Sequence, residues 1–87
     1  MNKTSEYHVT SFIAHSLPRG KQALANEIKT IEGAEVHAIS NEGKIVFTVE
    51  ANDQRLIANR VDQIRYHDEL LSLSPIYHQF LTEEQSY

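Results

Sequence analysis

The 87-residue sequence contains no cysteine. A disulfide framework, a thiolate metal site and a cysteine nucleophile are therefore all excluded. No apolar run approaches the roughly 18 residues that a membrane-spanning helix needs, and the first residues, MNKTSEYHVT, lack the apolar segment of a secretory signal peptide. We therefore expect a cytoplasmic protein that does not insert into membranes.

Glycine, proline and basic residues are also scarce. With three Gly, two Pro and 40% hydrophobic residues, the composition is that of an ordinary folded domain, and the length allows only one. We predict a single domain over residues 1–87 with an ordered core of about 7–80. Eight Lys and Arg against twelve Asp and Glu give a net charge of -4, which opposes the phosphate contacts that dominate nucleic-acid binding. We therefore expect no nucleic-acid partner.

Hydrophobic periodicity divides the chain into two similar halves. Alternating or β-branched runs predict strands at residues 7–14, 34–40, 44–50 and 71–80. Leu24, Ile28 and Ile31 form one helical stripe that begins after Pro18 and ends at Gly33. Ile57 and its helical neighbours Val61 and Ile64 form a second stripe, which Asn52 or Asp53 can cap and which ends near Tyr66 or His67.

The resulting order, βαββαβ, predicts an α+β protein with the ferredoxin-like fold. In that fold a four-stranded antiparallel sheet of order 4-1-3-2 carries both helices on one face. The strand at 71–80 then lies at an edge, which is where a sheet accepts Pro75 because proline has no amide to donate.

The other face of this sheet would be open to a partner. We expect one set of residues in the first and last strands to face inward: Val9, Ile13, Leu71, Leu73, Pro75 and Tyr77. Alternation then places four apolar residues on the open face, Phe12, Ile39, Val46 and Ile76. Glu35 and Glu50 lie at the fringe of this apolar patch. The predicted peptide-binding residues are those that share this face: His8, Thr10, Phe12, Glu35, Ile39, Val46, Thr48, Glu50, Ile76 and His78. Because Phe12 would lie outside the core, its replacement by Ser should weaken binding without unfolding the domain.

An apolar patch on an open sheet has more than one interpretation. Small sheets leave some apolar groups exposed, or use them to dimerise. A peptide that presents both arginine and bulky apolar side chains would also fit a patch of this composition.

The sequence contains no recognisable catalytic constellation. It has no nucleophile elbow, no P-loop and no dinucleotide-binding glycine pattern, so we predict that the chain is not an enzyme and needs no cofactor. Five histidines are present, but none forms a metal-binding pair at helical spacing, so we predict no metal site.

Specific residues add a family resemblance. Three runs of the sequence carry it: IEGAEVHAI, KIVFTVEAND and LSLSPIYHQ. Their most recognisable points are Gly33-x-Glu35-Val36, Val49-Glu50-Ala51 and Tyr77-His78-Gln79. With these runs the chain resembles the NapD family over about Tyr7 to Gln79. Pro75 departs from the family's pattern. The resemblance implies a ferredoxin-like cytoplasmic chaperone that binds the twin-arginine signal peptide of the periplasmic nitrate reductase catalytic subunit on the open sheet face. It would delay export until the molybdenum cofactor has been inserted.

Two alternatives stay open at this point. The peptide could instead add as a strand to the free edge at residues 34–40. The chain could also be a small regulatory or oligomerisation domain whose open face pairs with itself or senses a metabolite. If the chain is a chaperone, we expect the protein to be a monomer.

Overall fold

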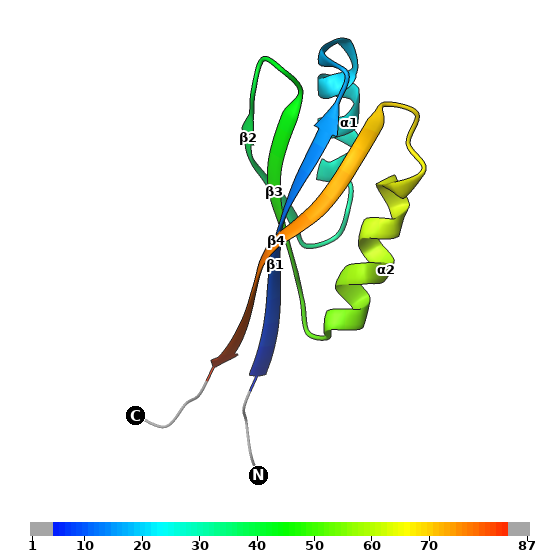
Figure 1. Ribbon diagram of the computed structural model, residues 1–87. Helices are drawn as coiled ribbons and strands as arrows, with labels where there is room; N and C mark the ends of the chain where they lie inside the picture. The colour runs from blue at the N-terminus through cyan, green and yellow to red at the C-terminus, as the bar shows by residue number, and fades with distance from the viewer. Residues whose placement is uncertain (1–4, 84–87) are drawn as a thin grey trace.

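Residues 5–83 form four strands, two α-helices and one short 3-10 helix, as described by a computed structural model (Figure 1). Side chains are described for residues 7–78. The elements follow along the chain as β1 (Ser5–Ser16), η1 (Pro18–Gly20), α1 (Lys21–Lys29), β2 (Ala34–Ile39), β3 (Lys44–Ala51), α2 (Gln54–Arg65) and β4 (Leu70–Glu83).

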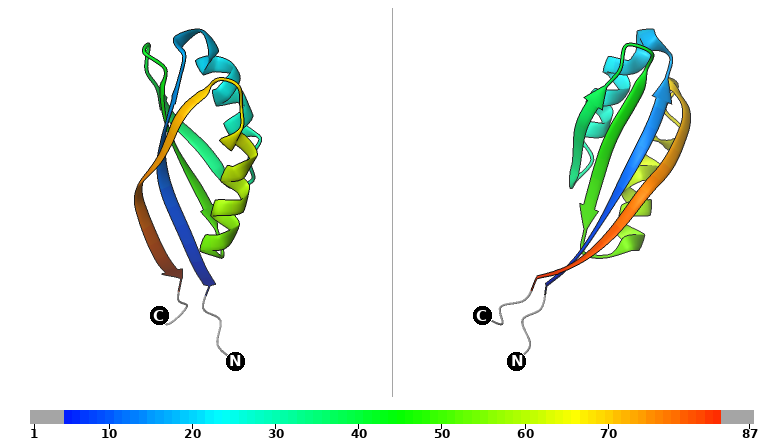
Figure 2. Two further views of the ribbon diagram at one scale, coloured as in Figure 1. Left: turned by 45° about the vertical axis from the view of Figure 1, so that its right-hand side comes forward. Right: turned by 60° about the vertical axis from the view of Figure 1, so that its left-hand side comes forward.

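The four strands form one antiparallel sheet in the order β2-β3-β1-β4, and both α-helices lie on the same face of it (Figure 2). This is the predicted 4-1-3-2 order read from the other edge, so the ferredoxin-like prediction is confirmed. β4 lies at an edge, as Pro75 indicated. β1 and β4 continue to pair beyond the end of β3, which makes a two-stranded ribbon that projects from the sheet (Figure 1).

Both helices begin and end close to their sequence signals. Pro18 starts the 3-10 turn that leads into α1, and Gly33 follows α1 with a φ of 82°. Asp53 caps α2, because its carboxylate accepts a 2.8 Å hydrogen bond from the backbone amide of Arg55. That hydrogen bond, followed by one from the Arg55 side chain, lowers the pKa of the Asp53 carboxyl.

The core lies between the sheet and the helices, and it includes residues of β1 that alternation had placed on the other side. Phe12 is only 7% exposed, and its ring stacks on Phe47 with centroids 5.2 Å apart. Thr10 and Ala14 are buried beside it, so the prediction that Thr10 and Phe12 lie on the open face is wrong. The physical reason is that β1 carries apolar residues on both faces, and the large ring occupies the deeper space beneath the helices.

β-Bulges account for the other misplaced residues. In β2 the register shifts between Val36 and Ala38, so Ile39 pairs with Ile45 and packs on the core instead of facing outward. In β4, Tyr77 pairs with Ser11 but Pro75 pairs with Phe12, which leaves Ile76 as the extra residue.

The bulge in β4 reverses the orientation of the residues that follow it. Tyr77 therefore faces away from the helices and is 61% exposed, whereas His78, as the partner of Thr10, faces the helix side. His8 also belongs to the helix side, because it alternates with Thr10 and its ring stacks on that of His78. The predictions for Tyr77, His8 and His78 are therefore wrong. Leu71 was also predicted to face inward but is 61% exposed, because a second register shift skips it.

Candidate functional site: the open face of the sheet

The surface of the sheet opposite the helices is called the open face here. Strand register places the following residues on it: Glu35 and Ala38 from β2; Lys44, Val46, Thr48 and Glu50 from β3; Val9, Ser11, Ile13 and His15 from β1; Ser72, Ser74 and Tyr77 from β4. The register skips His37, but its contact with Thr48 places it on the same face. Figure 2 shows that neither helix covers this face. All four strands present side chains on it.

Four of the ten predicted binding residues lie on the open face, namely Glu35, Val46, Thr48 and Glu50. Ile76 lies at the β4 bulge on the edge of the sheet and is 53% exposed. The remaining five lie on the helix side: His8, Thr10, Phe12, Ile39 and His78. The predicted apolar patch of Phe12, Ile39, Val46 and Ile76 therefore does not exist as one surface.

A different apolar area takes its place on the β1 and β4 half of the open face. Val9 and Ile13 are partly buried there, and Tyr77 is largely exposed beside them. Simple alternation missed all three, because β1 offered two apolar faces and nothing in the sequence marks Ile76 as a bulge. Val46 on the neighbouring strand β3 extends this area toward the centre of the sheet.

The β2 and β3 half of the open face is acidic at one end and carries Lys44 at the other. Glu35 pairs with Thr48, and Glu50 lies two residues further along the same face of β3, so both carboxylates belong to one end of this half. Both side chains are exposed. Charge and apolar surface are thus separated across the sheet.

A cavity of about 260 Å³ adjoins this acidic end, and we call it the acidic notch. The residues that line it are Tyr7, Glu32, Gly33, Glu50, Ala51, Asn52, Leu56 and Arg60. Arg60 holds the notch together, because its Nη1 donates to the backbone carbonyl oxygens of Glu32 (3.4 Å) and Glu50 (3.2 Å). A Cβ at Gly33 would collide with the same Glu50 carbonyl, so only glycine fits there.

Histidines tie neighbouring strands together. On the open face, His37 Nε2 lies 2.9 Å from Thr48 Oγ1, and His15 Nδ1 lies 3.1 Å from Ser72 Oγ. On the helix side, His8 Nδ1 lies 3.0 Å from His78 Nε2. Within the part of the chain that the structure describes, no three His, Asp or Glu side chains gather closely enough to hold a metal ion.

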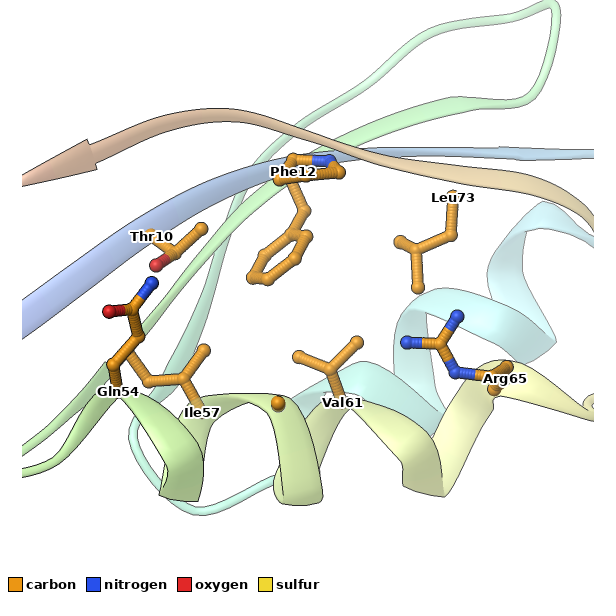
Figure 3. Close-up of a pocket in the computed structure, with 9 residues that line it drawn as sticks. Thr10, Phe12, Gln54, Ile57, Val61, Arg65 and Leu73 are labelled. Carbon is orange, nitrogen blue, oxygen red and sulfur yellow. The ribbon is translucent and has the colours of Figure 1, made fainter.

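The helix side has a cavity of its own, which we call the α2–β4 cleft. It has a volume of about 210 Å³ and is lined by Thr10, Phe12, Gln54, Ile57, Ala58, Val61, Arg65, Leu73 and Pro75. Figure 3 shows Phe12 reaching down from β1 toward Ile57 and Val61, with Gln54 at one end of the cleft and Arg65 at the other. The cleft and the open face lie on opposite sides of the sheet.

The described residues, 5–83, also contain no helix that is long and apolar enough to cross a membrane.

Comparisons with known proteins agree with this architecture. Residues 7–82 match the family model described as NapD protein. A relative named Chaperone NapD, from Haemophilus influenzae, is 24% identical over 80 residues, which cover 91% of this chain and 86% of that protein. The solution structure of the E. coli Tat proofreading chaperone protein NapD superposes with a TM-score of 0.77 at 21% identity, covering 93% of this chain and 83% of that one.

The family model spans nearly all of the chain, and the named relatives are chaperones, so the prediction of a non-enzymatic protein is confirmed. The match reaches all four strands that form the open face and both helices on the opposite side of the sheet. The chain therefore belongs to the NapD family.

Proposed function

We propose that this protein is a cytoplasmic chaperone that binds the twin-arginine signal peptide of the periplasmic nitrate reductase catalytic subunit and delays its export until cofactor insertion is complete. The observation that carries this proposal is the family match over residues 7–82. The name of the E. coli relative, a Tat proofreading chaperone, supports the same role. The open face supplies a surface whose chemistry suits such a peptide.

A twin-arginine signal peptide has a cationic part followed by an apolar part, and the open face has a counterpart for each. The carboxylates of Glu35 and Glu50 suit the two guanidinium groups, whereas Glu32 in the acidic notch is already ion-paired with Arg60, 3.7 Å from Oε1 to Nη2. Val9, Ile13 and Tyr77 suit the apolar segment. The peptide would therefore cross the sheet from the acidic half toward β1 and β4.

The dimensions of the face fit an apolar segment in helical form. Such a segment of about 12 residues is about 18 Å long as a helix. With neighbouring strands about 4.8 Å apart, the two edge strands of the sheet are about 14 Å apart, whereas β3, with eight residues, is about 27 Å long. The peptide would therefore cross the sheet obliquely, so that the apolar helix and the stretch carrying the arginines both lie on the open face.

Apolar contact should supply most of the affinity. Burying about 300 Å² of apolar surface contributes roughly 8 kcal/mol before the cost of ordering the peptide is subtracted. Exposed ion pairs are worth about 1 kcal/mol or less each, because water and salt screen them. The carboxylates would then set the orientation of the peptide more than its affinity.

Calorimetric titration of the full chain with a synthetic leader tests this proposal. Three peptides are compared: the native leader, a version with both arginines changed to lysine, and a version with a polar segment in place of the apolar one. We expect the lysine version to bind a few-fold more weakly and the polar version to lose binding. Absence of heat with the native leader at tens of micromolar would refute the proposal.

Strand addition at the edge strand β2 is the competing mode of binding. β2 has six residues and its outer edge is not covered by another strand. Its bulge at His37 interrupts the regular ladder that an added strand would follow. Amide exchange separates the two modes, because strand addition would protect the amides of β2, whereas face binding would leave them unchanged.

A further inference from the structure

The α2–β4 cleft plays no part in the proposed recognition of the leader, because it lies on the helix side of the sheet. It lies between α2 and the inner side of β1 and of the edge strand β4. Leu73 is only partly buried and Pro75 is exposed, although both face the helix layer. Part of the apolar inner surface of β4 is thus accessible from the side.

The size and lining of the cleft suit one apolar side chain. Its volume of about 210 Å³ is below the roughly 300 Å³ at which sites for drug-sized ligands begin. Phe12, Ile57 and Val61 are almost completely buried and form a fixed apolar floor, and Leu73 forms one wall. A leucine-sized group entering from solvent would contact apolar atoms on several sides.

The end of the cleft at Arg65 suits an anion. Among the described residues that line the cleft, Arg65 is the one charged residue, whereas the acidic notch has two carboxylates and one guanidinium, that of Arg60. The Nε of Arg65 forms a 2.7 Å ion pair with the carboxylate of Asp62, which orients the guanidinium and offsets part of its charge, while the two terminal nitrogens take no part in this contact. Figure 3 shows its terminal nitrogens directed over the cleft toward Leu73.

The spacing of these two features matches an extended peptide. Val61 and Arg65 are one helical turn apart, which is about 6 Å along the axis of α2. Residues i and i+2 of an extended chain are about 6.6 Å apart and point to the same side. An apolar residue and an acidic residue separated by one position would therefore reach both features together.

We propose that the α2–β4 cleft binds an extended peptide segment with the pattern apolar–x–acidic. The apolar side chain lies between Phe12, Val61 and Leu73, and the carboxylate pairs with Arg65. Recognition occurs through side chains, because Pro75 and the adjacent bulge disrupt the backbone ladder that strand addition to β4 would need. The partner thus has the opposite charge preference from the leader at the open face.

The first test is an NMR titration of the full-length protein with the peptide acetyl-Ser-Leu-Ser-Glu-Ser-amide. We expect shift changes at the amides of Phe12, Ala58 and Leu73. Changing the peptide's Glu to Gln should weaken binding about twofold to fivefold, as an exposed ion pair does. Changing its Leu to Ser should abolish binding. No shift changes at millimolar peptide, or changes confined to the open face, would overturn the proposal.

Two variants and a matched control locate the site. Arg65→Gln should remove the preference for Glu over Gln in the peptide, while Arg55→Gln on the same helix, outside the cleft, should keep it. Ala58→Leu should fill the mouth of the cleft and reduce binding at least tenfold, with thermal unfolding used to confirm that the variant is folded. Equal effects of the Arg65 and Arg55 variants would overturn the assignment. Leader binding should be unchanged in all three variants, so the two proposals succeed or fail separately.

Discussion

The two faces of the sheet are built from the same four strands, but they differ in what their side chains contact. On the helix side, Phe12, Phe47 and their neighbours are buried against α1 and α2. On the open face, Val9 and Ile13 are partly buried and Tyr77 is exposed. An apolar residue in this small sheet therefore either builds the core or is available to a partner. Which of the two it does depends on whether the helices cover its face of the sheet.

The sharpest contrast is expected between Phe12→Ala and Tyr77→Ala. Phe12 fills the core, so its truncation should lower the free energy of unfolding by about 3–5 kcal/mol and leave little folded protein. Tyr77 is exposed, so its truncation should change that free energy by only about 0.5 kcal/mol. Chemical denaturation measures both. Similar losses of unfolding free energy for the two variants would contradict the conclusion that only the helix side of the sheet belongs to the core.

A second comparison uses the two glycines with positive φ. Gly33→Ala and Gly43→Ala should each cost about 1–3 kcal/mol of stability, because each residue has left-handed φ and a Cβ would meet a backbone carbonyl. Only the Gly33 variant should also weaken leader binding, since Gly33 lines the acidic notch. Denaturation and calorimetry on both variants test this. If Gly43→Ala weakened binding equally, the notch would have no specific part in recognition.

On the open face, Tyr77→Ser should act on binding and not on folding. If the leader binds as proposed, loss of the ring removes apolar contact with it, and we expect affinity to fall about fivefold to tenfold. Gln22→Ala, an exposed change on α1, serves as the control and should leave the affinity unchanged. Calorimetry gives both values. An unchanged affinity for the Tyr77 variant would show that the apolar part of the leader does not contact β4.

A smaller effect is expected from Glu50→Gln. Removing one exposed carboxylate should weaken leader binding about twofold to fivefold at low salt, and the difference from the unmodified protein should shrink as salt increases. Titrations at two salt concentrations measure this. Glu42→Gln, in the β2–β3 turn, is the matched control. A salt-independent loss would argue against an ion pair.

The smallest effect concerns the cap of α2, on the helix side. The folded protein holds the pKa of Asp53 below its ordinary value of 3.8, so the carboxylate stabilises the fold at neutral pH. This contribution is lost as pH falls below 3.8 and through the lowered folded-state pKa. Asp53→Ala should therefore lower Tm by a few degrees at neutral pH, and the difference should narrow toward pH 3. A difference that did not change with pH would rule out the charged cap.

Much of the fold could be predicted because its signals are local. Ile45, Phe47 and Val49 alternate cleanly, Asp53 caps α2, and Gly33 ends the turn after α1, and each lies where the pattern placed it. The candidate site was harder to predict. Glu35, Val46, Thr48 and Glu50 fell on the expected face because their strands were read in the right phase, whereas Ile39 and His78 follow bulges that reverse the phase.

The sequence by itself determined the order of elements, the position of the edge strand with Pro75, and the family to which the chain belongs. Only the tertiary structure decided which side of β1 and of the end of β4 meets the helices. The physical reason is that alternation defines two faces but does not name the buried one. That choice depends on whether the ring of Phe12 or the smaller side chains of Val9 and Ile13 fill the space beneath two helices.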